Sequence, residues 1–357
     1  MADKTPIEWT DATWNPIAGC SVISPGCTNC YAMREAGTRL RSAPKFEGLT
    51  QPSKAGPVWT GDMRLWEKAL GQPLRWEKPR RIFVNSMSDL FHESVPDEWI
   101  DRIFAIMALC PQHTFQVLTK RAERMRDYQS GRYRKDDIYG EAAACLPLVP
   151  RDRRWAIADA RQGEWPLSNI WLGVSVEDQE RLERIRELLA TAAAVRWVSL
   201  EPLLGQVDLE RLTIAPALYL DALTGAHSGE VATSYAAISQ GNWQAPPLPP
   251  RRPSLDWVVL GGESGPGARP MDSAWARAVR DQCRAAHVPF FFKQWGEWLP
   301  RDQLGWRDPT ESFDGCEWTA DHVRVGKKAA GRHLDGKTWD EYPRGSGDVD
   351  KGQSRPL

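Results

Sequence analysis

The chain has 357 residues, enough for one large or two ordinary domains, and its 41% hydrophobic and 26% charged residues are typical of a globular protein with a sizeable core. Its formal net charge of −1 gives no overall argument for a nucleic-acid or membrane partner. The N-terminal segment lacks the apolar run of a signal peptide and no stretch approaches roughly 18 apolar residues, so we expect a cytoplasmic protein with reduced thiols and no membrane partner.

Seven short apolar runs, most of them followed by a polar cluster and then a helical pattern, predict parallel strands that are buried on both faces. The segments that contain them are 13–18, 81–89, 114–121, 169–178, 195–202, 255–264 and 288–296. Helical periodicity is present at 97–110, 177–192 and 272–286. The alternation predicts an α/β fold, and a complete or partial barrel of parallel strands suits the strand count better than an open doubly wound sheet.

Three stretches interrupt this alternation, namely 41–80, 127–168 and 213–254, the last of which ends in a proline-rich segment. We expect them to be long insertions in one barrel domain that spans residues 1–300. Residues 301–357 form a polar, glycine-rich C-terminal extension, and we expect its last dozen residues to be disordered.

Polar side chains follow most of the expected strands, where the loops of a βα-repeat fold collect functional groups. The candidates are Asn85, Ser86, Ser88, Asp89, Thr119, Lys120, Arg121, Ser175, Glu177, Asp178, Ser199, Glu201, Glu263, Ser264, Lys293 and Gln294. Helix capping is an equal alternative for Ser88, Asp89 and Asp178. Glu201 and Lys293 align with the strands themselves, so we expect their side chains to point into one shared opening at the carboxyl ends of the strands.

Three of the seven cysteines, Cys20, Cys27 and Cys30, fall within TWNPIAGCSVISPGCTNCYA at residues 13–32. The other four are scattered singly, which argues against a disulfide framework. Three interpretations compete. A structural zinc site needs four ligands, and the histidine nearest to the three cysteines in the sequence, His92, is far from them. Buried inert cysteines suit a turn-rich loop poorly. A [4Fe–4S] cluster with three cysteine ligands would leave one iron open for a substrate or cosubstrate.

This loop resembles the cluster loop of radical S-adenosylmethionine enzymes, especially the spore photoproduct lyase-like branch, in which it reads approximately N-P-Y-x-G-C-x-x-x-C-x-x-C-Y-A. The matching positions are Asn15, Pro16, Gly19, Cys20, Cys27, Cys30, Tyr31 and Ala32. The chain more closely resembles a phage-associated uncharacterised family with a C-x6-C-x2-C loop. That resemblance covers about residues 5–300 and is carried by NSMSDLFH, LTKR, GVSVED, EPLLG, GGESG and KQWG.

The chain departs from the usual radical enzyme pattern at two points. The first cysteine spacing is six residues in place of three, an insertion that a flexible loop tolerates. Asn29 occupies the position where an aromatic residue normally stacks near the adenine of the cofactor, and Tyr31 is the candidate to replace it.

The resemblance implies a partial (β/α)6 barrel and a [4Fe–4S] cluster on Cys20, Cys27 and Cys30. S-adenosylmethionine would chelate the open iron. One electron from a reductase or flavodoxin-type donor would then cleave S-adenosylmethionine, and the resulting 5′-deoxyadenosyl radical would abstract hydrogen from the substrate. Cofactor-binding positions would be Tyr31, Ser86, Ser88, Asp89, Ser175 and Glu177. Catalytic or substrate-facing positions would be Glu201, Glu263, Lys293 and Gln294.

The resemblance also suggests a substrate, a (hyper)modified thymine base in phage DNA that is isomerised or otherwise modified in the host cytoplasm. Basic clusters at 78–81, 120–126 and 151–154 are candidate phosphate contacts, although a solvated face is the commoner explanation for such clusters. One alternative is a radical enzyme acting on a small metabolite or peptide. Another is a non-catalytic zinc or iron–sulfur interaction module with a proline-rich segment near 245–253.

Overall fold

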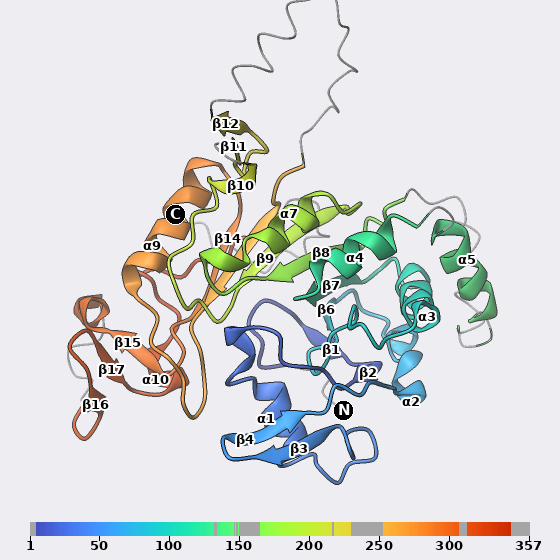
Figure 1. Cartoon of the computed structure of the whole chain (residues 1–357), viewed down its shortest axis with the longest axis horizontal. Helices are drawn as coiled ribbons and strands as arrows, with labels where there is room; N and C mark the ends of the chain where they lie inside the picture. Colours follow the sequence, from blue (N-terminus) through green and yellow to red (C-terminus); the bar gives the residue numbers. More distant parts are fainter. Residues whose placement is uncertain are drawn as a thin grey trace, which may run out of the picture.

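A computed structural model describes residues 5–131, 134–145, 147, 149, 165–215, 218–229, 253–306 and 313–343. Its centre is a seven-stranded parallel sheet that curls through 207° as a half-barrel, in the order β1-β6-β7-β8-β9-β13-β14 (Figure 1). The strands are β1 (Ala12–Trp14), β6 (Arg81–Val84), β7 (Thr114–Thr119), β8 (Ile170–Ser175), β9 (Val195–Leu200), β13 (Trp257–Gly261) and β14 (Phe290–Gln294). The prediction of a partial barrel of parallel strands is confirmed.

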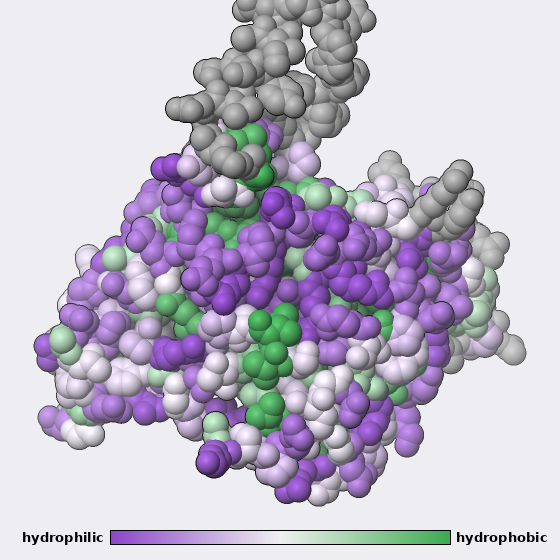
Figure 2. All heavy atoms as spheres, viewed as in Figure 1, coloured by the Kyte–Doolittle hydropathy of each residue, from purple (hydrophilic) through white to green (hydrophobic). Residues whose placement is uncertain are grey.

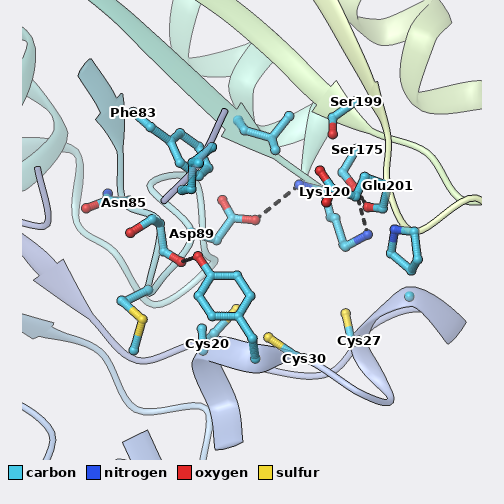
Figure 3. A pocket seen from close by; sticks show the side chains of 18 of the residues that line it. Cys20, Cys27, Cys30, Phe83, Asn85, Asp89, Lys120, Ser175, Ser199 and Glu201 are labelled. Carbon is cyan, nitrogen blue, oxygen red and sulfur yellow. Dashed lines mark hydrogen bonds between the residues drawn. The ribbon is translucent and has the colours of Figure 1, made fainter. Parts of the chain in front are cut away.

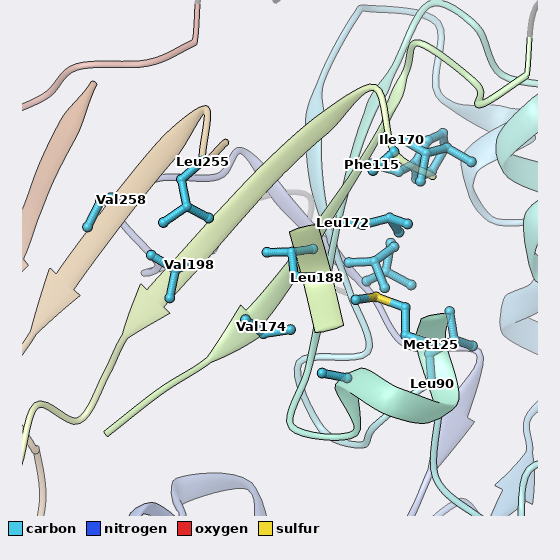
Figure 4. Close-up of a cluster of buried hydrophobic side chains, with 14 of the residues drawn as sticks. Leu90, Phe115, Met125, Ile170, Leu172, Val174, Leu188, Val198, Leu255 and Val258 are labelled. Carbon is cyan, nitrogen blue, oxygen red and sulfur yellow. The ribbon is translucent and has the colours of Figure 1, made fainter. Parts of the chain in front are cut away.

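Helices cover the outer face of this sheet. They are α3 (Asp97–Ala108), α4 (Ala122–Gln129), α7 (Glu183–Leu189) and α9 (Ser273–Ala285), and the short 3-10 helix η5 (Gln179–Arg181) precedes α7. Figure 4 shows aliphatic side chains such as Leu172 and Val174 of the sheet facing Met125 of α4 and Leu188 of α7. The strands are continuous apolar runs because this outer layer buries one of their faces.

Aromatic side chains fill the inner face of the half-barrel. They are Phe83, Trp171, Trp197, Trp257 and Phe291, one from each of five strands. Trp9, from the N-terminal segment, inserts among them, with its ring centroid 4.8 Å from that of Phe83 and 5.2 Å from that of Trp197. Several of the 18 tryptophans are therefore packing residues of the barrel interior.

The three expected insertions carry small elements of their own. Residues 41–80 contain the hairpin β3 (Thr50–Ser53) and β4 (Gly56–Trp59), the strand β5 (Arg64–Leu65), α2 (Glu67–Leu70) and the 3-10 helix η2 (Pro73–Arg75). β5 pairs with β2 (Ile17–Ala18). The other two insertions contain α5 (Arg134–Ala144) and the antiparallel sheet of β10 (Leu212–Ala215), β11 (Leu218–Leu220) and β12 (His227–Gly229).

The C-terminal extension packs against the barrel. Its elements are η6 (Arg301–Trp306), β16 (Glu317–Trp318), β17 (His322–Arg324) and α10 (Lys327–Ala330), and β17 pairs with β15 (Trp298–Pro300), which directly precedes the extension. The N–H of Phe292 in the edge strand β14 donates to the Trp339 carbonyl, and the Tyr342 ring lies 5.2 Å from that of Trp257. The extension thus covers a sheet edge that would otherwise be open. The last dozen residues, expected to be disordered, lie outside the described residues.

Within the described ranges, no helix has both the length and the apolar character needed to cross a membrane.

Gly173 provides a test of the aromatic interior, because a Cβ at this position in β8 would lie 2.4 Å from the Trp197 indole. We expect Gly173→Ala to lower the free energy of unfolding by about 1–3 kcal/mol, since the indole must move. Gly140→Ala in α5 is the matched control: its Cβ meets no atom within 4 Å, and alanine should stabilise that helix by about 0.5–1 kcal/mol. Urea unfolding measures both, and an unchanged Gly173 variant would contradict the tight packing.

Candidate functional site

A cavity of about 360 Å³ opens at the carboxyl ends of the parallel strands. The strand-end residues in its wall are Asn85, Ser86, Ser88, Asp89, Thr119, Lys120, Arg121, Ser175, Ser199, Glu201, Glu263, Ser264 and Lys293. Of the other sequence candidates, Glu177, Asp178 and Gln294 are not part of the wall. Because parallel strands all end at the same edge of the sheet, residues more than 200 positions apart line this single cavity.

The three clustered cysteines lie in the same wall. All three are free and partly exposed, and Figure 3 shows them along one side of the cavity, across from Asp89, Lys120, Ser175 and Glu201. The thiols are close enough to influence one another electrostatically. Burial raises the pKa of Cys20 to about 12, with further increases from Asp89 and the other two thiols, while Arg121 opposes the rise. Burial likewise raises the pKa of Cys30.

Thiols are donors for more than one kind of metal centre. Among the residues that the structure describes, no group of three or more His, Cys, Asp or Glu side chains could hold a metal ion. A structural zinc ion takes four ligands, whereas each cysteine of a [4Fe–4S] cluster binds a different iron. Three thiols in one cavity wall are the donors that a cluster with one open iron would use.

His92 lies against the cysteine loop, although it is far away in sequence. Its Nδ1 accepts a hydrogen bond from the Ser94 N–H at 3.1 Å, so the ring hydrogen is on Nε2, which lies 2.9 Å from Ser21 Oγ. Burial and the nearby Arg121 lower the pKa of His92. Both ring nitrogens are thus occupied by protein groups, and His92 supports the loop in place of serving as a fourth ligand.

Glu177 anchors the middle of the cysteine loop from outside the cavity. Its carboxylate is fully buried, accepts from Ser24 Oγ at 2.6 Å and Arg184 Nη1 at 3.0 Å, and forms an ion pair with Lys120. Burial alone would raise the pKa of Glu177, but Lys120, Arg184 and Ser24 together hold it below its usual value. Gly26 permits the close approach, because a Cβ there would lie 2.5 Å from Glu177.

The far end of the loop is fastened by Asn29. Its Nδ2 donates to Glu263 Oε2 at 3.0 Å and to the Gly267 carbonyl at 2.8 Å. Glu263 also pairs with Arg269 at 2.6 Å, and Arg269 donates to the Pro25 carbonyl at 2.9 Å. Burial alone raises the pKa of Glu263, whereas Arg269 and Asn29 bring it below its usual value. The residue that replaces the expected aromatic therefore links the cysteine loop to the turn after β13.

The stretch between the first two cysteines is hydrogen-bonded to side chains of the barrel. Ser21 and Ser24 both lie in the six-residue stretch between the first two cysteines, and each is hydrogen-bonded to a buried side chain. Val22 and Ile23 between them are 47% and 43% exposed. Figure 2 shows a small hydrophobic area over the loop that precedes α1 (Tyr31–Gly37), on an otherwise largely hydrophilic face.

Several strand-end candidates have defined structural partners. Asp89 accepts four hydrogen bonds, from the Phe91 and Lys120 N–H groups, Thr119 Oγ1 and Arg121 Nη1. Ser88 Oγ donates to the Ile17 carbonyl, and Ser86 Oγ donates to Asn15 Oδ1. Asp178 caps η5 by accepting from the Glu180 N–H, in agreement with the capping alternative. Tyr31 Oη donates to the Ser86 carbonyl at 2.5 Å.

Two candidates face the cavity as an ion pair. Lys293 Nζ lies 2.5 Å from Glu201 Oε1, and both residues are in the wall. Ser199, which is 1% exposed, is in the same wall. Gln294, which is not in the wall, donates to the Gly262 carbonyl. This side of the cavity thus holds an ammonium group, a carboxylate and a hydroxyl.

The basic clusters give little support to a phosphate-binding surface. Arg81 begins β6, at the opposite end of the sheet from the cavity, and pairs with Asp11. In the second cluster, Arg124 pairs with Asp97 and Arg126 with neighbouring carboxylates. The third cluster, 151–154, lies outside the described residues.

Sequence reasoning identified the cysteines and the strand ends but missed the side chains that organise them. No sequence pattern around Ser24, Arg184 or Arg269 indicated that these residues belong to the site. The sequence placed Lys120 and Arg121 after a strand and in a candidate phosphate-binding cluster, whereas the structure gives them direct contacts with the buried carboxylates of Glu177 and Asp89.

Comparison with known proteins identifies the family. Residues 4–343 match the family described as Protein of unknown function (DUF5131). The chain belongs to this family. No curated protein and no solved structure matches it.

Glu177→Gln tests the anchor of the loop. We expect it to lower the free energy of unfolding by about 3 kcal/mol at neutral pH, because Lys120 and Arg184 lose their buried counter-charge. The pKa of Glu177 is lowered on folding, so its contribution is present above the unfolded value near 4.5 and is lost as pH falls through the folded pKa. The difference between variant and wild type in urea unfolding should therefore shrink in acid.

The control for this variant is Glu123→Gln on α4, whose side chain is 79% exposed and pairs with Arg126 across one helical turn. It should change stability by less than about 0.5 kcal/mol. Equal destabilisation by the two substitutions would contradict the role assigned to Glu177.

Proposed function

We propose that the protein is a radical S-adenosylmethionine enzyme whose [4Fe–4S] cluster is held by Cys20, Cys27 and Cys30. The observation that carries the proposal is the position of these thiols in the wall of a cavity at the carboxyl ends of a parallel half-barrel. Ligands of such folds bind at that edge. When bound, the cluster and its cofactor supply a one-electron route to hydrogen abstraction from carbon.

The chain's own residues support the donor set in two ways. Cysteines bind iron as thiolates; burial raises the pKa of Cys20 and Cys30, and the cationic groups of Arg121 and Lys120 partly oppose that rise. Ser21, Ser24 and Asn29 hold the loop on three different supports, and the three sulfurs are in the wall of one cavity.

Cofactor contact is proposed for Tyr31, Ser86, Ser88, Asp89 and Ser175, all of which line the cavity. Glu177 is separated from the cavity, and its part is to position the cysteine loop. Glu263 acts similarly at the far end of the loop, although one of its surfaces reaches the wall.

Glu201 and Lys293 are proposed to face the substrate. In the pair, Lys293 Nζ donates to Glu201 Oε1. A substrate oxygen that replaced Glu201 would receive this hydrogen bond, and Glu201 would then be free to accept a proton. Ser199 Oγ supplies a further hydrogen-bonding group at the same side of the cavity.

The proposed substrate is a (hyper)modified thymine base in phage DNA, isomerised or otherwise altered after it leaves the base stack. Ile7, Trp9, Phe83 and Leu118 give the cavity an apolar wall against which a flat ring can pack. A small metabolite or peptide is the second candidate. The cavity volume lies in the range of small-molecule sites, and the described basic clusters are paired with carboxylates.

The chemistry is tested by anaerobic reconstitution with iron and sulfide, reduction, and addition of S-adenosylmethionine. Wild-type protein should bind iron and release 5′-deoxyadenosine, and the variant with Cys20, Cys27 and Cys30 all changed to alanine should do neither. Cys316→Ala, which alters a partly buried cysteine remote in sequence from the loop, should retain both. Zinc in place of iron, or a loaded cluster that never cleaves the cofactor, would overturn the proposal.

The substrate is tested separately by binding to DNA that carries the modified base. If DNA is the substrate, affinity should fall steeply as salt is raised, because phosphate contacts release counterions. Electrophoretic titration at several salt concentrations measures this. Cofactor cleavage without any DNA binding would support a small metabolite or peptide.

A further inference from the structure

Arg121 connects the cysteine loop to a buried carboxylate. It lies two residues after the end of β7, its side chain is 4% exposed, and its guanidinium contacts two atoms of the loop. Nη1 lies 3.9 Å from Cys20 Sγ, and Nη2 donates to Ser21 Oγ at 2.6 Å. Nη1 also donates to Asp89 Oδ2 at 3.0 Å. One planar cation thus contacts both the first cysteine and its neighbour.

This contact distinguishes Cys20 from the other two cysteines. Within the described part of the chain, Cys20 is the one thiol of the three with a hydrogen bond from a charged side chain. Cys27 lies 3.7 Å from the neutral Ser24 hydroxyl. A guanidinium keeps its charge at every accessible pH, and its field is strong in a buried site. Hydrogen bonds and positive charge at a ligating sulfur stabilise the reduced form of an iron–sulfur cluster.

Two carboxylates oppose this effect, since Nη1 donates to Asp89 and Nε donates to Glu93 at 3.0 Å. Asp89 is the buried one of the two, and its negative charge offsets part of the cation's field at Cys20, whereas the Glu93 side chain is largely exposed and screened by solvent. Three of the four hydrogen bonds to Asp89 come from Phe91, Thr119 and Lys120, so its position does not depend on Arg121. The charges of Arg121 and Asp89 can therefore be removed one at a time.

We propose that Arg121 and Asp89 set the reduction potential of the cluster through Cys20, Arg121 raising it and Asp89 lowering it. Both act as positioning and tuning residues and not as iron ligands. This inference rests on the proposed function, because it requires a cluster on the three cysteines.

The test is a redox titration of reconstituted protein, followed by the electron paramagnetic resonance signal of the reduced cluster. Arg121→Gln should shift the midpoint potential to lower values, and Asp89→Asn should shift it to higher values. Arg124→Gln is the matched control: it removes an arginine three residues further on, which pairs with Asp97, and should leave the potential unchanged. Iron and sulfide content is measured for every variant.

Opposite shifts would be hard to obtain from general loosening of the loop, which should move both variants in one direction. Shifts of the same sign, or no shift in fully loaded variants, would overturn the inference and leave the proposed function standing. Wild-type protein that takes up no cluster would overturn both. If Arg121→Gln fails to retain iron, the inference is tested with Asp89→Asn and Arg121→Lys. Arg121→Lys conserves the charge, so we expect it to shift the midpoint potential less than Asp89→Asn does.

Discussion

The buried carboxylate of Glu177 is the constraint on which the candidate site depends. It joins the end of β8 to Lys120 after β7, to Arg184 of α7 and to Ser24 of the cysteine loop. A fully buried carboxylate costs free energy unless its oxygens are satisfied, so these partners must be in place together. The cysteine loop is consequently ordered by the barrel itself, and its geometry exists only when β7, β8 and α7 have packed.

The two faces of the sheet carry different kinds of side chain and pack against different parts of the molecule. Aliphatic side chains on the outer face pack against the helices, and aromatic rings on the inner face fill the half-barrel. Trp9 and Phe83 belong to this aromatic layer and also line the cavity. The cavity at the carboxyl ends of the strands lies beside this filled interior, and the thiols, the Glu201–Lys293 pair and Ser199 all line it.

The departures from the radical enzyme pattern have physical explanations in the surrounding structure. The longer first spacing contributes Ser21 and Ser24, which fasten the loop to Arg121 and Glu177. Asn29, where an aromatic residue was expected, fastens it to Glu263 and Gly267. Ser21, Ser24 and Asn29 lie where the chain departs from the radical enzyme pattern, and each of them hydrogen-bonds the cysteine loop to the barrel.

The apolar runs predicted an α/β fold with a parallel sheet, because uninterrupted runs of strand length indicate burial on both faces and their alternation with helices favours parallel pairing. The sequence also located the three cysteines and the polar strand ends. The choice of which polar groups face the cavity, and the curl of the sheet into a half-barrel, came from packing in the folded chain. Glu177 and Glu201 occupy similar positions after neighbouring strands, yet Glu177 meets Ser24, 153 residues away, whereas Glu201 meets Lys293, 92 residues away. Such partners are chosen by packing over long sequence distances, which no local pattern of residues encodes.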